Sequence, residues 1–107
     1  MNSLKHTARY DRDYTNRLEA VRKITDEEFL YDIVFNDSNR NVKMAAVKNI
    51  TNQKYLTQIA KSHPNCYVRI EAIKRIDEKS TIEFISVNDS NRTVRKICIE
   101  LLKNHSS

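Results

Sequence analysis

The sequence predicts an all-α protein made of four similar pairs of helices, and three observations support this prediction. First, the 107 residues include no glycine and one proline. Because β-sheet proteins use glycine in turns and bulges, this composition favours helices joined by turns of Asn, Asp and Ser. Second, similar residues recur every 26 positions. Third, the apolar residues within each 26-residue stretch have helical spacing.

The repeat divides the chain without any insertion. NDSNRNV at 36–42 and NDSNRTV at 88–94 are nearly identical, and SHPNCYV at 62–68 occupies the same position between them. We divide one domain, residues 1–107, into repeats 1–25, 26–51, 52–77 and 78–103. Residues 104–107 then form a short tail that we expect to fray.

The first helix of each repeat is clearest in the second repeat. Phe29, Leu30, Ile33 and Val34 lie on one side of a helix and form one apolar stripe. The preceding segment at 25–28, Thr-Asp-Glu-Glu, has the pattern of a capping box and predicts the start of this helix.

The second helix of each repeat follows a residue suited to capping. These residues are Asp13, Asn39, Asn65 and Asn91. After Asn39, the apolar residues Val42, Ala46, Val47 and Ile50 form the inner face of the helix. The repeated heptapeptide is therefore predicted to be the turn between two antiparallel helices.

The first and last repeats depart from the common pattern. Asn16 stands where the other repeats have valine, and Lys96 stands where they have Leu18, Met44 and Ile70. Such departures are expected at the ends of a stacked array, because each end repeat has one uncovered face.

The segments DSNRNVKMAAVKNI and HPNCYVRIEAIKRI resemble the short HEAT-like repeats of small bacterial and archaeal proteins. The resemblance implies a short right-handed α-solenoid of four helix pairs, a fold used mostly as a protein-binding scaffold. Some relatives assist bilin attachment, and one glycosylase family binds DNA on its concave face. The resemblance also implies a structural ladder of turn aspartates and basic residues along the stack. Its members here are Asp11, Arg17, Asp37, Lys43, Arg69, Asp89 and Arg95. His63 replaces the aspartate in the third repeat, so we expect a weaker ladder there.

The outer side of the second helices is the predicted binding face. In a stack of this kind it carries an apolar row beside a basic row. The apolar row is Leu18, Met44 and Ile70, and the basic row is Arg22, Lys48 and Lys74. We expect this concave face to bind an acidic, amphipathic segment of another protein.

Two alternatives use the same residues. The charged side chains could simply be solvated, with Glu19 paired to Lys23 and Glu71 to Arg75, each four residues on. The apolar row could then pack on the next repeat. The net charge of +5 could instead attract nucleic acid through the basic row. The basic residues are mixed with acidic ones, however, and tryptophan is absent, so we favour the protein partner.

No enzymatic or cofactor site is expected. His63 and Cys66, with Cys98 and His105, could supply four zinc ligands, but each of them fills an ordinary repeat or tail position. Zero glycine also argues against phosphate or dinucleotide loops. We therefore expect no catalytic residue, metal, cofactor or small-molecule ligand. With no apolar membrane span, no secretory signal and unpaired cysteines, a cytoplasmic location is expected.

Overall fold

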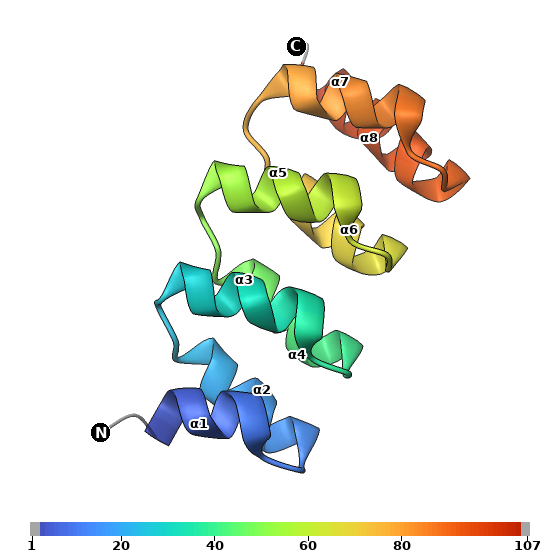
Figure 1. The fold of residues 1–107 in the computed structure, drawn as a ribbon. Helices are drawn as coiled ribbons and strands as arrows, with labels where there is room; N and C mark the ends of the chain where they lie inside the picture. Colours follow the sequence, from blue (N-terminus) through green and yellow to red (C-terminus); the bar gives the residue numbers. More distant parts are fainter. Residues whose placement is uncertain (1–2, 106–107) are drawn as a thin grey trace. The chain divides into compact units, whose positions relative to one another are not determined.

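The computed structural model describes residues 3–105 and shows an all-α fold in that range, with no β-strand (Figure 1). This confirms the all-α part of the predicted fold class. The helices are α1 (Ser3–Tyr10), α2 (Tyr14–Arg22), α3 (Glu27–Asn36), α4 (Arg40–Lys48), α5 (Gln53–Ser62), α6 (Cys66–Ile73), α7 (Lys79–Asn88) and α8 (Arg92–His105).

The chain divides into two compact units, which we call the N-terminal unit (Met1–Asn52) and the C-terminal unit (Gln53–Ser107). In the N-terminal unit, α1 packs against α2, α3 packs against α4, and α2 packs against α4. The C-terminal unit has the same pattern, in which α5 packs on α6, α7 on α8, and α6 on α8. The division falls within one residue of the boundary at 51/52 that the 26-residue repeat predicts.

The predicted caps of the second helices are confirmed. The side chains of Asp13, Asn39, Asn65 and Asn91 each accept hydrogen bonds from backbone N–H groups in the first turn that follows. These bonds satisfy donors that the first turn of an α-helix leaves without intrahelical partners. The predicted capping box at 25–28 is wrong by one residue: Asp26 is the N-cap of α3 and accepts from Phe29 N at 3.2 Å.

Each compact unit has its own apolar core, built from the helical faces that the spacing predicts. The fully buried side chains of the N-terminal unit include Val21, Leu30, Val34, Val42 and Val47, and those of the C-terminal unit include Leu56, Ile59, Val68 and Ile73. Among residues 3–105, no buried polar side-chain atom lacks a hydrogen-bond partner.

The C-terminal helix is longer than expected. The sequence predicts a frayed tail from residue 104, but α8 continues through His105. The remaining tail residues, Ser106 and Ser107, lie outside the described part of the chain. Within that part, no helix is both long and apolar enough to cross a membrane.

Candidate functional site

In the N-terminal unit, a turn aspartate connects one helix pair to the next. Arg17, in the first turn of α2, donates from Nε to Asp37 Oδ2 at 2.9 Å and from Nη2 to Oδ1 at 3.3 Å. Only 4% of the Asp37 side chain and 11% of Arg17 are exposed, so water screens this pair weakly. Arg17 Nη1 also donates to Asp11 O at 2.8 Å, which fixes the guanidinium on its own turn.

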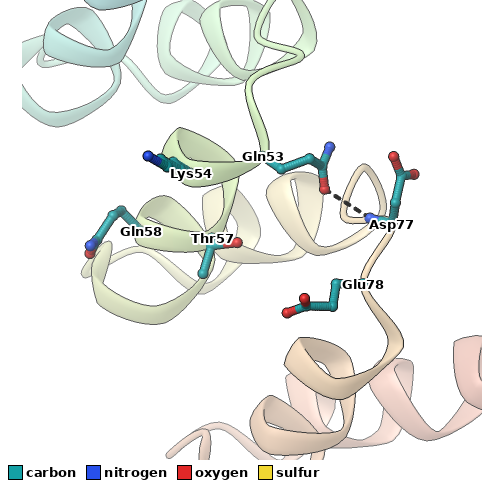
Figure 2. Close-up of a pocket in the computed structure, with 6 residues that line it drawn as sticks. All are labelled: Gln53, Lys54, Thr57, Gln58, Asp77 and Glu78. Atoms are coloured by element: carbon teal, nitrogen blue, oxygen red, sulfur yellow. Dashed lines mark hydrogen bonds between the residues drawn. The ribbon is translucent and has the colours of Figure 1, made fainter.

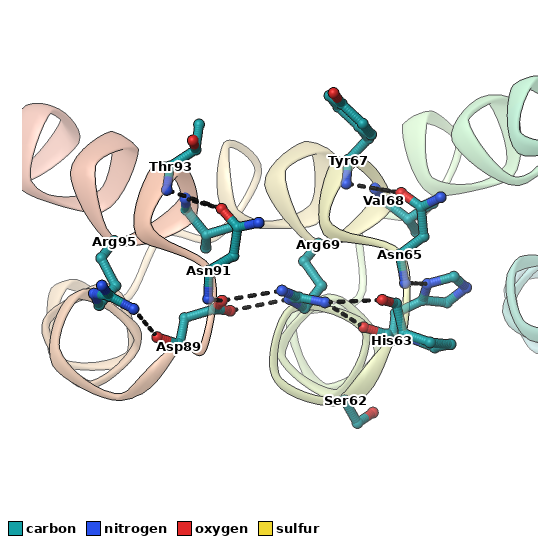
Figure 3. Close-up of polar contacts among 12 residues, drawn as sticks. Ser62, His63, Asn65, Tyr67, Val68, Arg69, Asp89, Asn91, Thr93 and Arg95 are labelled. Atoms are coloured by element: carbon teal, nitrogen blue, oxygen red, sulfur yellow. Dashed lines mark hydrogen bonds and ion pairs between the residues drawn. The ribbon is translucent and has the colours of Figure 1, made fainter.

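The C-terminal unit repeats this geometry, as Figure 3 shows. Arg69 donates from Nε and Nη2 to the two carboxylate oxygens of Asp89, both at 3.0 Å, and from Nη1 to His63 O at 2.8 Å. Arg95 donates from Nη1 to Asp89 O at 2.7 Å. Arg17 and Arg69 therefore join one turn to the next by charge-assisted hydrogen bonds, whereas Arg95 is held against its own turn through Nη1.

Two positions of the repeat that belong to the predicted ladder carry a different side chain here. His63 is buried, and its Nδ1 accepts from Asn65 N at 3.0 Å (Figure 3). Asp37 and Asp89 accept the same backbone bond through Oδ1, so His63 replaces the local role of the carboxylate without its charge. Lys43 lies half-buried in the first turn of α4, at the position that Arg17 holds in α2.

Four of the six residues predicted to bind a partner come together in the N-terminal unit. Leu18 and Arg22 from α2 and Met44 and Lys48 from α4 line one hollow of about 400 Å³, and Asn41, Ala45 and Asn49 complete its lining. We call it the α2–α4 hollow.

The other two predicted residues belong to the C-terminal unit. There, Ile70 is half-buried in α6, and Lys74 is the exposed C-cap residue of this helix. They occupy the repeat positions of Met44 and Lys48, as the sequence predicts.

The two cations of the α2–α4 hollow have different partners. Arg22 Nη1 forms an ion pair with Glu19 Oε1 at 2.7 Å, one helical turn earlier. The alternative of a solvated face includes a Glu19–Lys23 pair, and the structure has a different pair there, because Arg22 reaches the Glu19 carboxylate instead. No carboxylate in the described chain forms an ion pair with Lys48, whose side chain is exposed. Lys48 is therefore the cation available to a bound anion.

The side-chain amide of Asn49, which lines this hollow, joins α4 to the end of α2. The Asn49 amide donates to Arg22 O at 2.9 Å and to Val21 O at 3.2 Å, where it satisfies carbonyls at the end of α2. These bonds fix α4 against α2. The hollow therefore lies between two helices that these bonds join, and Met44 is among its lining side chains.

A second hollow, of about 590 Å³, was not predicted (Figure 2). Gln53, Lys54, Thr57 and Gln58 of α5 line it, together with Asp77 and Glu78 from the segment before α7. Gln53 Oε1 accepts from Asp77 N at 2.9 Å, which fixes that segment to α5. Mixed polar residues of this kind have no pattern in the sequence that would distinguish them from an ordinary solvated surface.

The four residues considered as zinc ligands do not form a site in the described structure. His63 and Cys98 are buried, Cys66 is half-buried at the start of α6, and the side chain of His105 lies outside the described residues. Among the side chains that the structure describes, no three from His, Cys, Asp or Glu are grouped so that they could hold a metal ion.

Comparison with known proteins gives no relative. The chain matches no protein-family model, no curated protein and no solved structure at a significant level. The geometry of its own surface therefore provides the basis for a function.

Proposed function

We propose that the chain is a protein-interaction module that binds an acidic, amphipathic segment of a partner through the α2–α4 hollow. The supporting observation is that Leu18 and Met44 share this hollow with Arg22 and Lys48. An apolar surface beside cations suits a helix or extended peptide that has one apolar face and one acidic edge.

We further propose that the fold is a HEAT-like α-solenoid of four helix pairs. The support is the equivalence of Arg17–Asp37 and Arg69–Asp89, which join successive helix pairs by the same bonds in both compact units. A repeat of 26 residues that reproduces side-chain contacts, and not only helix positions, indicates one structural element used again.

The apolar part of the hollow would supply most of the affinity. Leu18 and Met44 are half-buried, so a bound side chain could remove the rest of their surface from water. Methionine adapts its shape to different partners because its side chain is unbranched and rotates about three bonds. Ile70, at the same repeat position of α6, would present a similar contact on the C-terminal unit.

The charged part would favour an acidic partner. Lys48 has no ion-pair partner in residues 3–105, whereas Arg22 is already paired with Glu19. The whole chain has a net charge of +5, which attracts acidic segments before contact. We expect Lys48 to contribute mainly to the association rate, as charges at the edge of an interface usually do.

The experiment uses the methyl group of Met44 as the reporter. The sequence has two methionines, Met1 and Met44. The methyl resonance of Met44 is therefore identified as the one that is missing from the spectrum of Met44→Leu. Peptides selected from a display library of amphipathic helices with acidic edges are titrated in. We expect the Met44 methyl resonance to shift on binding, and basic peptides with the same apolar face to leave it unchanged.

Two variants separate the contributions. Met44→Asp should abolish binding, because it places a carboxylate in the apolar part of the hollow, and the helical circular dichroism should remain. Lys48→Glu should slow association and reduce its salt dependence, with a smaller effect on dissociation. Normal peptide binding by Met44→Asp would exclude this hollow as the site.

A further inference from the structure

The ion pairs inside the two compact units share one geometry. Arg17 and Arg69 each donate through Nη1 to a carbonyl of the preceding turn. Each also donates through Nε and Nη2 to the aspartate 20 residues later. The two halves of this arrangement are a guanidinium fixed on its own turn and a carboxylate fixed on the next turn.

Arg95 has the donor half alone. Its Nη1 donates to Asp89 O at 2.7 Å, in the way that Arg17 Nη1 donates to Asp11 O at 2.8 Å. Within residues 3–105, no carboxylate forms an ion pair with Arg95. Its Nε and Nη2 are therefore oriented by the turn and have no anionic partner there.

Asp11 has the acceptor half alone. Its Oδ1 accepts from Asp13 N at 2.9 Å, as Asp37 Oδ1 does from Asn39 N at 2.8 Å. Asn16 Nδ2 also donates to this oxygen, at 3.2 Å. No arginine or lysine in the described chain pairs with the Asp11 carboxylate, although Asp37 holds an arginine through the same group.

Apolar residues near Arg95 and near Asp11 are exposed, whereas the residues at the equivalent positions of other repeats are buried. Ile99 of α8 is 46% exposed, whereas Val21 and Ile73 at the same repeat position are fully buried. Leu4 of α1 is 42% exposed, whereas Leu30 is fully buried. Leu4 and Asp11 also line one hollow, of about 230 Å³.

The charges near Arg95 and Asp11 would be complementary if the 26-residue repeat continued from one copy of the chain into the next. Leu18 and Ala45, from successive repeats, line one hollow in the N-terminal unit. If the last repeat met the first repeat of another copy in the same register, Lys96 would take the place of Leu18 and Glu19 that of Ala45. Two neutral residues that line one hollow would thus be replaced by two residues of opposite charge.

A second pair of equivalent positions would also bring residues of opposite charge together. The Asn49 amide reaches Arg22 O at 2.9 Å between successive repeats. In the same register, Glu100 stands at the position of Arg22, and Lys23 stands at the position of Asn49. This pair also combines opposite charges.

We propose that copies of this chain bind end to end in the register of the repeat, so that Arg95 of one copy forms the bidentate ion pair with Asp11 of the next. Ile99 and Leu4 become buried in the contact, and the charged pairs at the other equivalent positions flank it. The two surfaces are different, so the contact is heterologous and assembly does not stop at two copies unless a ring closes.

The first measurement is the mass of the 107-residue chain by sedimentation equilibrium over a wide concentration range. We expect the mean mass to rise continuously with concentration and to fall back toward the monomer at high salt, since exposed flanking charges are screened. Asp11→Asn keeps the acceptor for Asp13 N and removes only the charge, so it should weaken association while the circular dichroism is unchanged. Glu28→Gln removes the same single charge at an exposed position of α3 that takes no part in the contact. It is the matched charge control and should associate like the wild type.

A charge exchange tests the pairing itself. Arg95→Glu alone and Asp11→Arg alone should each stay monomeric, because each would place like charges opposite one another. A mixture of the two variants should associate again. In the mixture, the new carboxylate at position 95 of one variant meets the new guanidinium at position 11 of the other. The native Arg95 of the second variant meets the native Asp11 of the first. Recovery in the mixture identifies the two positions as partners, which no general loss of stability can imitate.

Three results would overturn the proposal. The wild type could stay monomeric at every concentration, or its mass could reach a plateau at a dimer that Asp11→Asn does not weaken. The third is a mixture of folded variants that fails to associate. Failure here would leave the peptide-binding hollow untouched, because Met44 and Lys48 take no part in the end-to-end contact.

Discussion

The two cysteines differ in the surroundings of their thiols. Cys98 is fully buried at a repeat position that holds alanine in the other three repeats. Burial raises the pKa of the Cys98 thiol to about 11, with a smaller contribution from the nearby Asp89 carboxylate. Cys66 is half-buried in the first turn of α6, so reagents can reach it more easily.

This difference predicts the order of chemical modification. Only the thiolate reacts with iodoacetamide, and a thiol with a raised pKa forms little thiolate at about pH 8. We expect one equivalent to react quickly at Cys66 and the second, at Cys98, only after denaturant is added. Mass spectrometry of the native protein, with Cys66→Ser as the control, checks this. Rapid modification of native Cys66→Ser would show that the α8 segment around Cys98 opens readily.

At the scale of elements, the ion pair between turns holds neighbouring helix pairs together. Asp37→Asn retains an acceptor for Asn39 N but removes the carboxylate that Arg17 contacts at 2.9 Å. Because this leaves a poorly exposed guanidinium without its anion, we expect the free energy of unfolding to fall by about 2 kcal/mol. Urea denaturation followed by circular dichroism measures it.

The chain contains its own control for that substitution. Asp11→Asn makes the same chemical change at the same repeat position, where no arginine pairs with the carboxylate in the described structure. We expect its effect on monomer stability to be within about 0.5 kcal/mol, as for ordinary surface changes. Equal losses in the two variants would mean that the turn, and not the Arg17–Asp37 pair, determines the cost.

The helices and their caps were predictable because their causes are local. Asn39, Asn65 and Asn91 cap helices through bonds to residues two and three positions later, so a short pattern contains the whole interaction. The capping box before α3 was misplaced because Thr25 and Asp26 are both good caps, and only the backbone geometry distinguishes them.

The candidate site was predictable only in part. The repeat register indicated that Leu18, Met44, Arg22 and Lys48 share a face, because equivalent positions of successive helices lie side by side. The pairing of Arg22 with Glu19 depends on side-chain rotamers, which no sequence spacing determines. The hollow at Gln53 was missed because it combines α5 with the segment at 77–78, which is distant in sequence and has no apolar pattern.

At the scale of the whole molecule, the net charge of +5 acts on any acidic partner, whatever site it finally occupies. At physiological ionic strength this field extends over roughly 8 Å, the Debye length. This positive field would attract both an acidic protein segment in the hollow and a nucleic acid on the surface. Only the protein segment would depend on Leu18 and Met44, because phosphates are bound by cations and polar donors and not by apolar side chains.

Salt therefore separates the two kinds of partner. Between about 50 and 300 mM salt we expect the association rate of an acidic peptide to fall and its dissociation rate to change little. Met44→Asp should abolish that binding at every salt concentration. Duplex DNA should bind weakly, with an affinity that falls steeply with salt and does not change in Met44→Leu, which keeps the charge. If DNA bound more tightly than any peptide, and Lys48→Glu with Lys74→Glu removed the binding, the basic row would be a nucleic-acid surface instead.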